Sequence, residues 1–127
     1  MEEELKPLIL IVDRHLNTLT WLDSLLSREG CRVTTCSSSV EALKAVAAQR
    51  LDLVIAGSVG PDRLGTVLVS KIKALSPETS VLLLLDSNDP SIVTEAIDAG
   101  ADGLLRRSYS ESQVVQRVER LLHVVQG

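Results

Sequence analysis

Five short segments with strand patterns alternate along this chain with five segments whose hydrophobic residues recur at helical spacing. The segments at residues 8–12, 51–56 and 81–85 are rich in Val, Ile and Leu and are expected to be buried strands. Residues 31–36 alternate and contain β-branched residues, which predicts a short, half-exposed strand, and residues 102–106 are expected to form a short fifth strand. Helices are expected in the segments that follow each of them, at residues 17–29, 37–49, 64–75, 90–100 and 110–125. Such regular alternation with short connections predicts a parallel sheet covered by helices on both faces. At 127 residues the chain has the length of one domain.

Local signals at the helix ends support these assignments. Ser38 followed by Glu41 forms a capping-box pattern, and Asp89 followed by Pro90 is typical of a helix start. Gly30 and Gly100 each stand where a helix C-terminal glycine is expected.

Composition and charge exclude several classes of function. Hydrophobic residues make up 45% of the chain but aromatic residues only 2%, so a site that stacks rings on a flavin or a base is not expected. The formal net charge is −4 and no basic cluster is longer than Arg106-Arg107, so this domain is not expected to bind nucleic acid. Cys31 and Cys36 lack the partners of a zinc site and are expected to be reduced thiols.

The chain also carries no targeting signal that we recognise. The apolar runs of five residues are far shorter than the roughly 20 residues needed to cross a bilayer. The N-terminus MEEELKP is acidic, unlike a signal peptide, so we expect no membrane association and a cytoplasmic location. Residues 1–6 are expected to form a flexible tail.

In open parallel sheets the functional crevice lies beyond the carboxyl ends of the strands. The residues at these ends are Asp13, Gly57, Leu85 or Asp86, and Arg106 or Arg107. These positions are therefore the candidates for a functional site.

The chain resembles the receiver domain of two-component response regulators over essentially its whole length. The resemblance lies in LILIVD, SSSVEALKAV, LDLVIAGSVGPDRLG, SVLLLLDSNDP and AIDAGADGLLRRSYS, in this order. It implies a single receiver domain over residues 1–127 with a flavodoxin-like (βα)5 fold, a doubly wound three-layer sandwich whose five parallel strands have the order 2-1-3-4-5. It also implies a part in phosphorelay signal transduction and no enzyme activity.

In the family, a histidine kinase transfers a phosphoryl group to an aspartate at the end of the third strand, and an acidic pair holds magnesium. Here the acidic pair matches Asp13 and Arg14, the phosphoacceptor matches Gly57, the Thr or Ser position matches Leu85, and the Lys position matches Arg107. The resemblance therefore implies a degenerate receiver with a vestigial phosphorylation site. Phosphotransfer from a histidine kinase is not expected, magnesium binding is expected to be lost, and no other cofactor is implied.

Arg14 leads to three hypotheses about the crevice. A guanidinium about 4 Å from a divalent ion repels it by roughly 8 kcal/mol at an effective dielectric constant of ~20. Arg14 would then occupy the place of the cation and pair with Asp13 or Asp86. Alternatively, Arg14 and Arg107 bind a small anion such as phosphate or sulfate, or both arginines point into solvent and the pocket is closed.

Three functions follow from these patterns. The first is a receiver domain that acts independently of phosphorylation as a protein interaction or dimerisation module, and the second is a small-anion sensor. The third is a conventional phosphorylated receiver with a displaced acceptor, although Ser58 would give a serine ester and Asp62 is typical of a turn residue.

The last helix is the expected interface, because it carries more apolar residues than one core stripe needs. Val115, Leu122 and Val124 are expected either to form an exposed patch for a second chain or to pack against a neighbouring element. Leu104 matches the aromatic switch residue of the family, and it can pack but cannot form the hydrogen bond of a Tyr.

Overall fold

The computed structural model describes residues 6–58, 65–86 and 89–126, the last four of these by their backbone alone. Within these residues the strands are β1 (Leu8–Val12), β2 (Arg32–Cys36), β3 (Leu53–Ala56), β4 (Ser80–Leu85) and β5 (Gly103–Arg106). The helices are α2 (Leu16–Arg28), α3 (Ser39–Ala48), α4 (Thr66–Leu75), α5 (Pro90–Ala99) and α6 (Glu111–Gln126). All ten elements expected from the sequence are present, and no end differs from the expected one by more than two residues.

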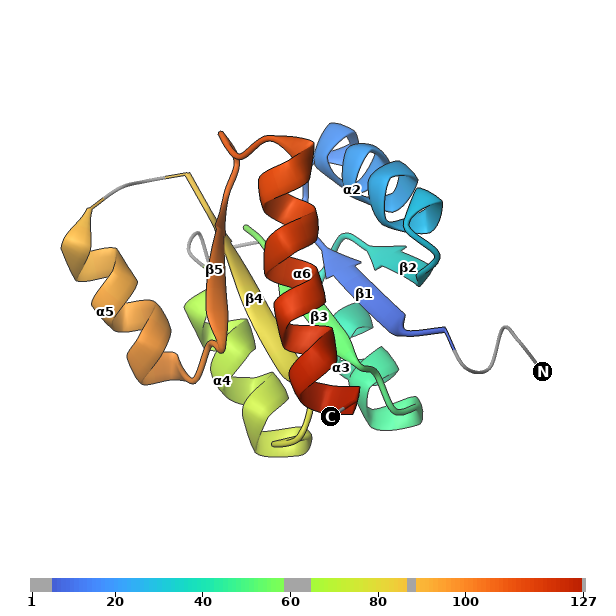
Figure 1. Ribbon diagram of the computed structural model, residues 1–127. Helices are drawn as coiled ribbons and strands as arrows, with labels where there is room; N and C mark the ends of the chain where they lie inside the picture. The colour runs from blue at the N-terminus through green and yellow to red at the C-terminus, as the bar shows by residue number, and fades with distance from the viewer. Residues whose placement is uncertain (1–5, 59–64, 87–88, 127) are drawn as a thin grey trace.

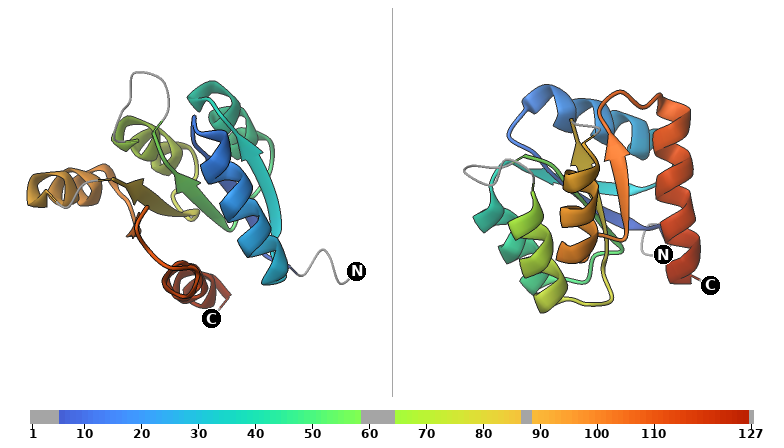
Figure 2. Two further views of the ribbon diagram at one scale, coloured as in Figure 1. Left: turned by 90° about the horizontal axis from the view of Figure 1, so that it is seen from above. Right: turned by 90° about the vertical axis from the view of Figure 1, so that its left-hand side faces the viewer.

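The strands form one parallel sheet in the order β2-β1-β3-β4-β5, as expected (Figure 1). Helices α2 and α6 cover one face of this sheet, and α3, α4 and α5 cover the other (Figure 2). The fold is therefore the flavodoxin-like three-layer α/β sandwich, and the carboxyl ends of all five strands lie along the same edge.

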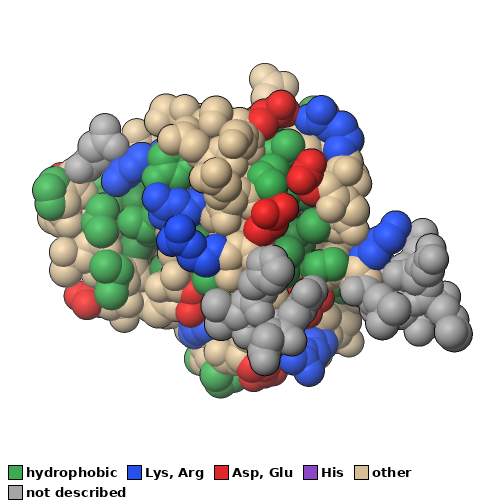
Figure 3. Space-filling view, in the orientation of Figure 1, with side chains coloured by type: hydrophobic (Ala, Val, Ile, Leu, Met, Phe, Trp, Pro, Cys, Tyr) green, Lys and Arg blue, Asp and Glu red, His purple; other side chains and the backbone are tan. Residues whose placement is uncertain are grey.

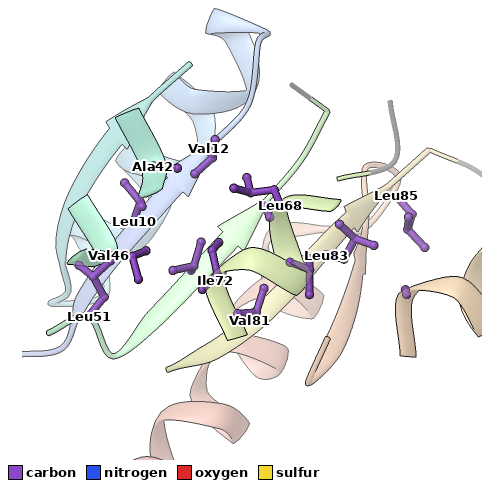
Figure 4. Close-up of a cluster of buried hydrophobic side chains, with 14 residues drawn as sticks. Leu10, Val12, Ala42, Val46, Leu51, Leu68, Ile72, Val81, Leu83 and Leu85 are labelled. Atoms are coloured by element: carbon purple, nitrogen blue, oxygen red, sulfur yellow. The ribbon is translucent and has the colours of Figure 1, made fainter. Parts of the chain in front are cut away.

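Each face of the sheet has its own hydrophobic cluster, because successive strand residues point to opposite sides. Ile9 and Ile11 of β1 pack toward α2 and α6, whereas Leu10 and Val12 pack toward α3 and α4. Figure 4 shows the cluster beneath α3, α4 and α5, in which Leu10 and Val12 lie beside Ala42 of α3 and the β4 side chains lie farther along the sheet. Burial on both faces explains why the three central strands β1, β3 and β4 are almost continuously apolar, whereas the edge strands β2 and β5 are only partly buried.

The helix ends confirm the local signals of the sequence. The hydroxyl of Ser38 accepts a hydrogen bond of 3.2 Å from the backbone N–H of Glu41. The carboxylate of Asp89 accepts one of 2.9 Å from the N–H of Ser91. Gly30 and Gly100 have φ values of +89° and +105°, a region that glycine enters without steric cost.

The third strand is shorter than expected, beginning at Leu53 rather than residue 51. The carboxylate of Asp52 accepts a 2.8 Å hydrogen bond from the N–H of Leu8, and the N–H of Asp52 donates to the carbonyl of Leu8. These contacts hold the approach to β3 beside the start of β1.

No helix within the described residues is long and apolar enough to span a membrane. The expected flexible tail lies almost entirely outside the described residues.

Candidate functional site

Four of the residues singled out in the sequence lie together at the carboxyl edge of the sheet. Asp13 directly follows β1, Gly57 directly follows β3, Leu85 ends β4, and Arg107 directly follows β5. Backbone hydrogen bonds hold these ends in register: Gly57 donates to Val12, and Arg107 donates to Leu85. The parallel sheet thus brings together residues that are far apart in the sequence.

Asp13 is the buried centre of this site, with an exposed fraction of 0%. Its Oδ1 accepts hydrogen bonds from the backbone N–H of His15 at 2.7 Å and contacts His15 Nδ1 at 2.8 Å. Its Oδ2 accepts a hydrogen bond of 2.5 Å from Nη2 of Arg107. Both carboxylate oxygens are therefore engaged within the protein, which offsets the cost of burying the charge.

Arg107 reaches from the end of β5 across the carboxyl edge of the sheet to Asp13. Its Nη1 donates a 2.7 Å hydrogen bond to the hydroxyl of Thr18, near the start of α2. Its Nε lies 2.5 Å from Oδ1 of Asp86, just after β4, although this N–H is not aligned for a hydrogen bond. The guanidinium of Arg107 thus contacts a carboxylate after β1, a carboxylate after β4 and a hydroxyl near the start of α2.

The carboxylate of Asp13 fills the space that a side chain at Gly57 would occupy. A Cβ atom built at Gly57 would lie 2.0 Å from Oδ2 of Asp13 and 3.2 Å from the carbonyl oxygen of Val12. Gly57 does not have a positive φ, so space rather than backbone conformation requires glycine here. In this arrangement any larger residue at position 57 displaces Asp13.

Arg14 does not take the role expected for it. Its side chain is exposed, and it forms no ion pair with any residue the structure describes. The hypothesis that Arg14 pairs with Asp13 or Asp86 is therefore wrong, and Arg107 makes both contacts. The physical reason is that consecutive residues of extended backbone point in opposite directions, so Arg14 points away from the buried site that Asp13 enters.

The two arginines also face different hollows of the surface. Arg14 lines one beside Thr35 and Glu41, whereas Arg107 lines another with His15 and Asp86. The geometry does not bring both guanidinium groups to one point, so it does not support an anion site made by the pair. The expectation that both point into solvent holds for Arg14 but not for Arg107, which is only partly exposed.

The residues present do not fit a magnesium ion. Magnesium is bound through carboxylates and other oxygens, but the oxygens of Asp13 are already occupied by His15 and Arg107. Gly57 adds no carboxylate, and the guanidinium of Arg107 places positive charge beside Asp13. Across the described ranges no group of three or more His, Cys, Asp or Glu side chains is arranged to hold a metal.

The interface residues expected on the last helix are placed differently. Leu122 is buried, with 7% exposed, which excludes it from an exposed patch and agrees with the alternative expectation that it packs against a neighbouring element. It continues the stripe of Val114 and Val118 at four-residue spacing, and this stripe faces the sheet. Val115 is half-buried at the edge of the same cluster, and the side chain of Val124 lies outside the described residues.

Leu104 is also partly buried and packs against the cluster beneath α5.

His15 and Thr18 are the residues of the site that the sequence did not reveal. His15 lies two residues after Asp13. In an Asx turn the side chain of an Asp accepts a hydrogen bond from the backbone N–H two residues later, so this spacing was the sequence signal that could have revealed the contact of His15 with Asp13.

Residues 9–119 match the family described as Response regulator receiver domain. Among curated proteins, the probable transcriptional regulatory protein TcrX of Mycobacterium tuberculosis is 28% identical over 114 residues, which cover 90% of this chain and 49% of TcrX. The chain thus spans about half the length of this relative.

Solved structures of similar fold cover nearly the whole chain. A response regulator receiver domain protein from Methanospirillum hungatei JF-1 has a TM-score of 0.88 at 21% identity, covering 95% of this chain and 97% of its own. At this identity the likeness concerns the fold. The BeF3-activated DrrB receiver domain has a TM-score of 0.84 at 27% identity, and the match covers 94% of this chain and 99% of the DrrB chain.

Proposed function

The chain belongs to the response regulator receiver domain family, and we propose that it acts in two-component signalling without being phosphorylated, as a domain that binds another protein or a second copy of itself. The proposal rests on one observation above all. The carboxylate of Asp13, held by Arg107, fills the space that a side chain at position 57 would need. Position 57 therefore has no carboxylate and no room for one, which supports the proposal.

The charges at the site support the same conclusion. Arg107 supplies a permanent positive charge beside Asp13, and its guanidinium has no accessible neutral form. A divalent ion at the same place would be repelled by Arg107 and would have to displace its hydrogen bonds. The Asp13–Arg107 pair thus takes the structural place of a metal ion with its carboxylate ligands.

The contacts of Arg107 favour one fixed arrangement of the carboxyl edge. They connect the end of β5 to the start of α2 through Thr18 and to the connection after β4 through Asp86. An internal ion pair thus connects these segments without a phosphoryl group. Leu104 adds no polar switch, because its side chain has no hydrogen-bonding group.

The surface formed by α5 and β5 is the interaction face we propose. Ile97 is exposed to 62%, Val93 lies one helical turn before it, and Leu104 is half-buried on the neighbouring strand. Figure 3 shows hydrophobic side chains gathered over α5 and toward β5, beside Lys and Arg side chains. An exposed apolar patch beside charged groups is typical of a protein–protein contact.

Beryllium trifluoride with magnesium, a mimic of the acyl phosphate, tests the absence of phosphorylation. We expect no amide chemical-shift change at Gly57, Asp13 or Arg107 when both are added in excess to the 15N-labelled chain. Acetyl phosphate is expected to add no phosphoryl group, as measured by intact mass. Saturable binding at submillimolar concentration would overturn the proposal in favour of a displaced acceptor, and a conventional receiver run in parallel is the positive control.

The other two hypotheses have less support from the geometry. Ser58 is buried with 6% exposed, so its hydroxyl is poorly placed to receive a phosphoryl group, and Asp62 lies outside the described residues. An anion sensor would need Arg107 to leave Asp13 and Asp86. Titration with sulfate or phosphate is expected to leave the Gly57 amide unshifted, and a saturable shift there would restore the sensor hypothesis.

A further inference from the structure

A hollow of about 320 Å³ lies between α2 and α6, at the opposite edge of the sheet from the Asp13–Arg107 pair. Pro7 and Cys31 line it, and these residues directly precede β1 and β2, so the hollow opens at the amino edge. The α2–α6 hollow is therefore separate from the Asp13–Arg107 pair, and its lining includes no residue of that site.

The floor of the α2–α6 hollow is apolar. Leu26 of α2 and Val118 and Leu122 of α6 form it, and each belongs to the hydrophobic cluster on this face of the sheet. Half-buried Val115 continues this surface outward. A side chain that entered the hollow would exchange water for aliphatic contacts on several sides.

The rim of the hollow is acidic on two sides. Glu29 follows α2 and Glu119 lies on α6, so the carboxylates come from opposite walls. Both residues are exposed, and neither forms an ion pair with any described residue. By contrast, Glu111 on the same helix pairs with Arg28 at 2.8 Å.

Cys31 shows that both carboxylates act on the interior of the hollow. Burial raises the pKa of the Cys31 thiol above its ordinary value, and the negative charges of Glu29 and Glu119 raise it further. The same field that disfavours a thiolate favours a cation at the mouth. In Figure 3 acidic side chains lie beside hydrophobic ones where α2 and α6 meet.

We propose that the α2–α6 hollow binds a segment of a partner protein that presents one apolar side chain flanked by Lys or Arg. The volume of about 320 Å³ accommodates one aliphatic side chain and leaves room for the adjoining parts of the flanking residues. The apolar side chain contacts Leu26, Val118 and Leu122, and the flanking cations meet Glu29 and Glu119. Two carboxylates on separate walls favour a ligand with cations on both sides of its apolar group, which a peptide provides.

The probe is the peptide acetyl-Lys-Lys-Leu-Lys-Lys-amide, titrated at low salt into the full chain with labelled Val and Leu methyl groups. We expect saturable shifts at Val118 and Leu122. Replacing the central Leu of the peptide by Ala, or its Lys residues by Glu, is expected to abolish them. Glu119→Gln and Glu29→Gln are each expected to weaken binding about two- to fivefold, the range of a single exposed ion pair.

Glu95→Gln on α5 is the matched control, because it removes the same charge from another surface. It is expected to leave the affinity unchanged, and equal weakening by this variant would mean that only net charge attracts the peptide. Absence of shifts at Val118 and Leu122 would overturn the proposal. Equal shifts with n-hexylamine at the same concentration would also overturn it, by assigning the hollow to free amines.

A chemical readout gives an independent measurement. The bound peptide is expected to slow alkylation of Cys31 by iodoacetamide and to leave Cys36 unaffected, because only Cys31 lines the hollow. Equal protection of both thiols would contradict the proposed position of the peptide.

Discussion

Nη2 of Arg107 lies 2.5 Å from Oδ2 of Asp13, although the two residues are 94 positions apart in the sequence. This pair joins the ends of β5 and β1 across the carboxyl edge of the sheet. Because Asp13 is fully buried, the pair also decides how that edge is packed and which residue fits at position 57. An internal electrostatic contact therefore holds the ends of β1 and β5 together at this edge.

The first prediction concerns the loss of Arg107. Arg107→Met leaves Asp13 buried without its counter-charge, and removing one partner of a buried pair typically costs 3–5 kcal/mol. Because Arg107 is 24% exposed, we expect the low end, about 3 kcal/mol, in the free energy of unfolding measured with urea. Arg14→Met is the matched control, expected within about 0.5 kcal/mol of the parent chain. Equal effects of the two changes would contradict the assigned role of Arg107.

The second prediction concerns both partners together. Asp13→Asn combined with Arg107→Met is expected to destabilise the chain less than the sum of the two single changes, because the double variant leaves neither charge unpaired. We expect a coupling energy of about 1–3 kcal/mol in the double-mutant cycle. Strict additivity would show that Arg107 stabilises the fold without acting on Asp13.

The third prediction concerns Gly57. Gly57→Ala introduces a methyl group 2.0 Å from Oδ2 of Asp13, so the carboxylate has to move and its contact with Arg107 is disturbed. We expect a loss of about 1–3 kcal/mol in the free energy of unfolding. Gly103→Ala is the control, since its Cβ would meet only the methyl end of Leu82 at 2.9 Å, which can rotate away.

Gly57→Asp follows from the same geometry. The added carboxylate is expected to face both the steric conflict and the negative charge of Asp13, so this change alone does not create a phosphorylation site. Intact mass after treatment with acetyl phosphate is expected to stay that of the unmodified variant. A phosphorylated product would show that Asp13 leaves Arg107 readily.

The fourth prediction concerns the pH dependence of Cys36. Burial, and secondarily the charge of Glu41, raises the pKa of the Cys36 thiol from 9.0 to about 11. The folded state therefore holds this proton more tightly than the unfolded state. The resulting contribution to stability is complete below pH 9 and is lost as the pH rises toward 11.

Alkylation measures the same shift directly. At pH 8 the thiolate fraction of Cys36 is expected to be about a hundredfold lower in the folded than in the unfolded chain, since two pKa units separate the states. Iodoacetamide labelling of a Cys31→Ser variant, with and without urea, compares the two rates. Similar rates in both states at pH 8 would contradict the shift.

The fifth prediction concerns self-association through α5 and β5. If a second copy is the partner, Ile97→Glu is expected to shift sedimentation at about 100 μM toward the monomer, because it places a charge in the apolar patch. Leu75→Glu is the matched control, since Leu75 is similarly exposed, to 56%, at the end of α4. A parent chain that is monomeric at this concentration would favour a different protein as the partner.

Most of the fold was predictable from the sequence because its signals are local. The apolar runs, the Ser38 and Asp89 caps and the glycines at 30 and 100 each depend on neighbouring residues, and all of them are confirmed. For Leu122 the sequence left open whether it forms an exposed patch or packs against a neighbouring element, because two adjacent stripes of α6 are apolar. Only contact with the sheet decides which of these stripes is buried.

The sequence by itself determined that position 57 has no acceptor group, since folding cannot supply a missing carboxylate. It also placed Asp13, Gly57, Leu85 and Arg107 at the ends of strands. Only the tertiary structure decided that Arg107 rather than Arg14 neutralises Asp13. The reason is geometric. How the strands are assembled sets the direction in which a side chain at a strand end points and the distance it spans across the sheet. Sequence proximity to Asp13 favoured Arg14, which was the wrong arginine.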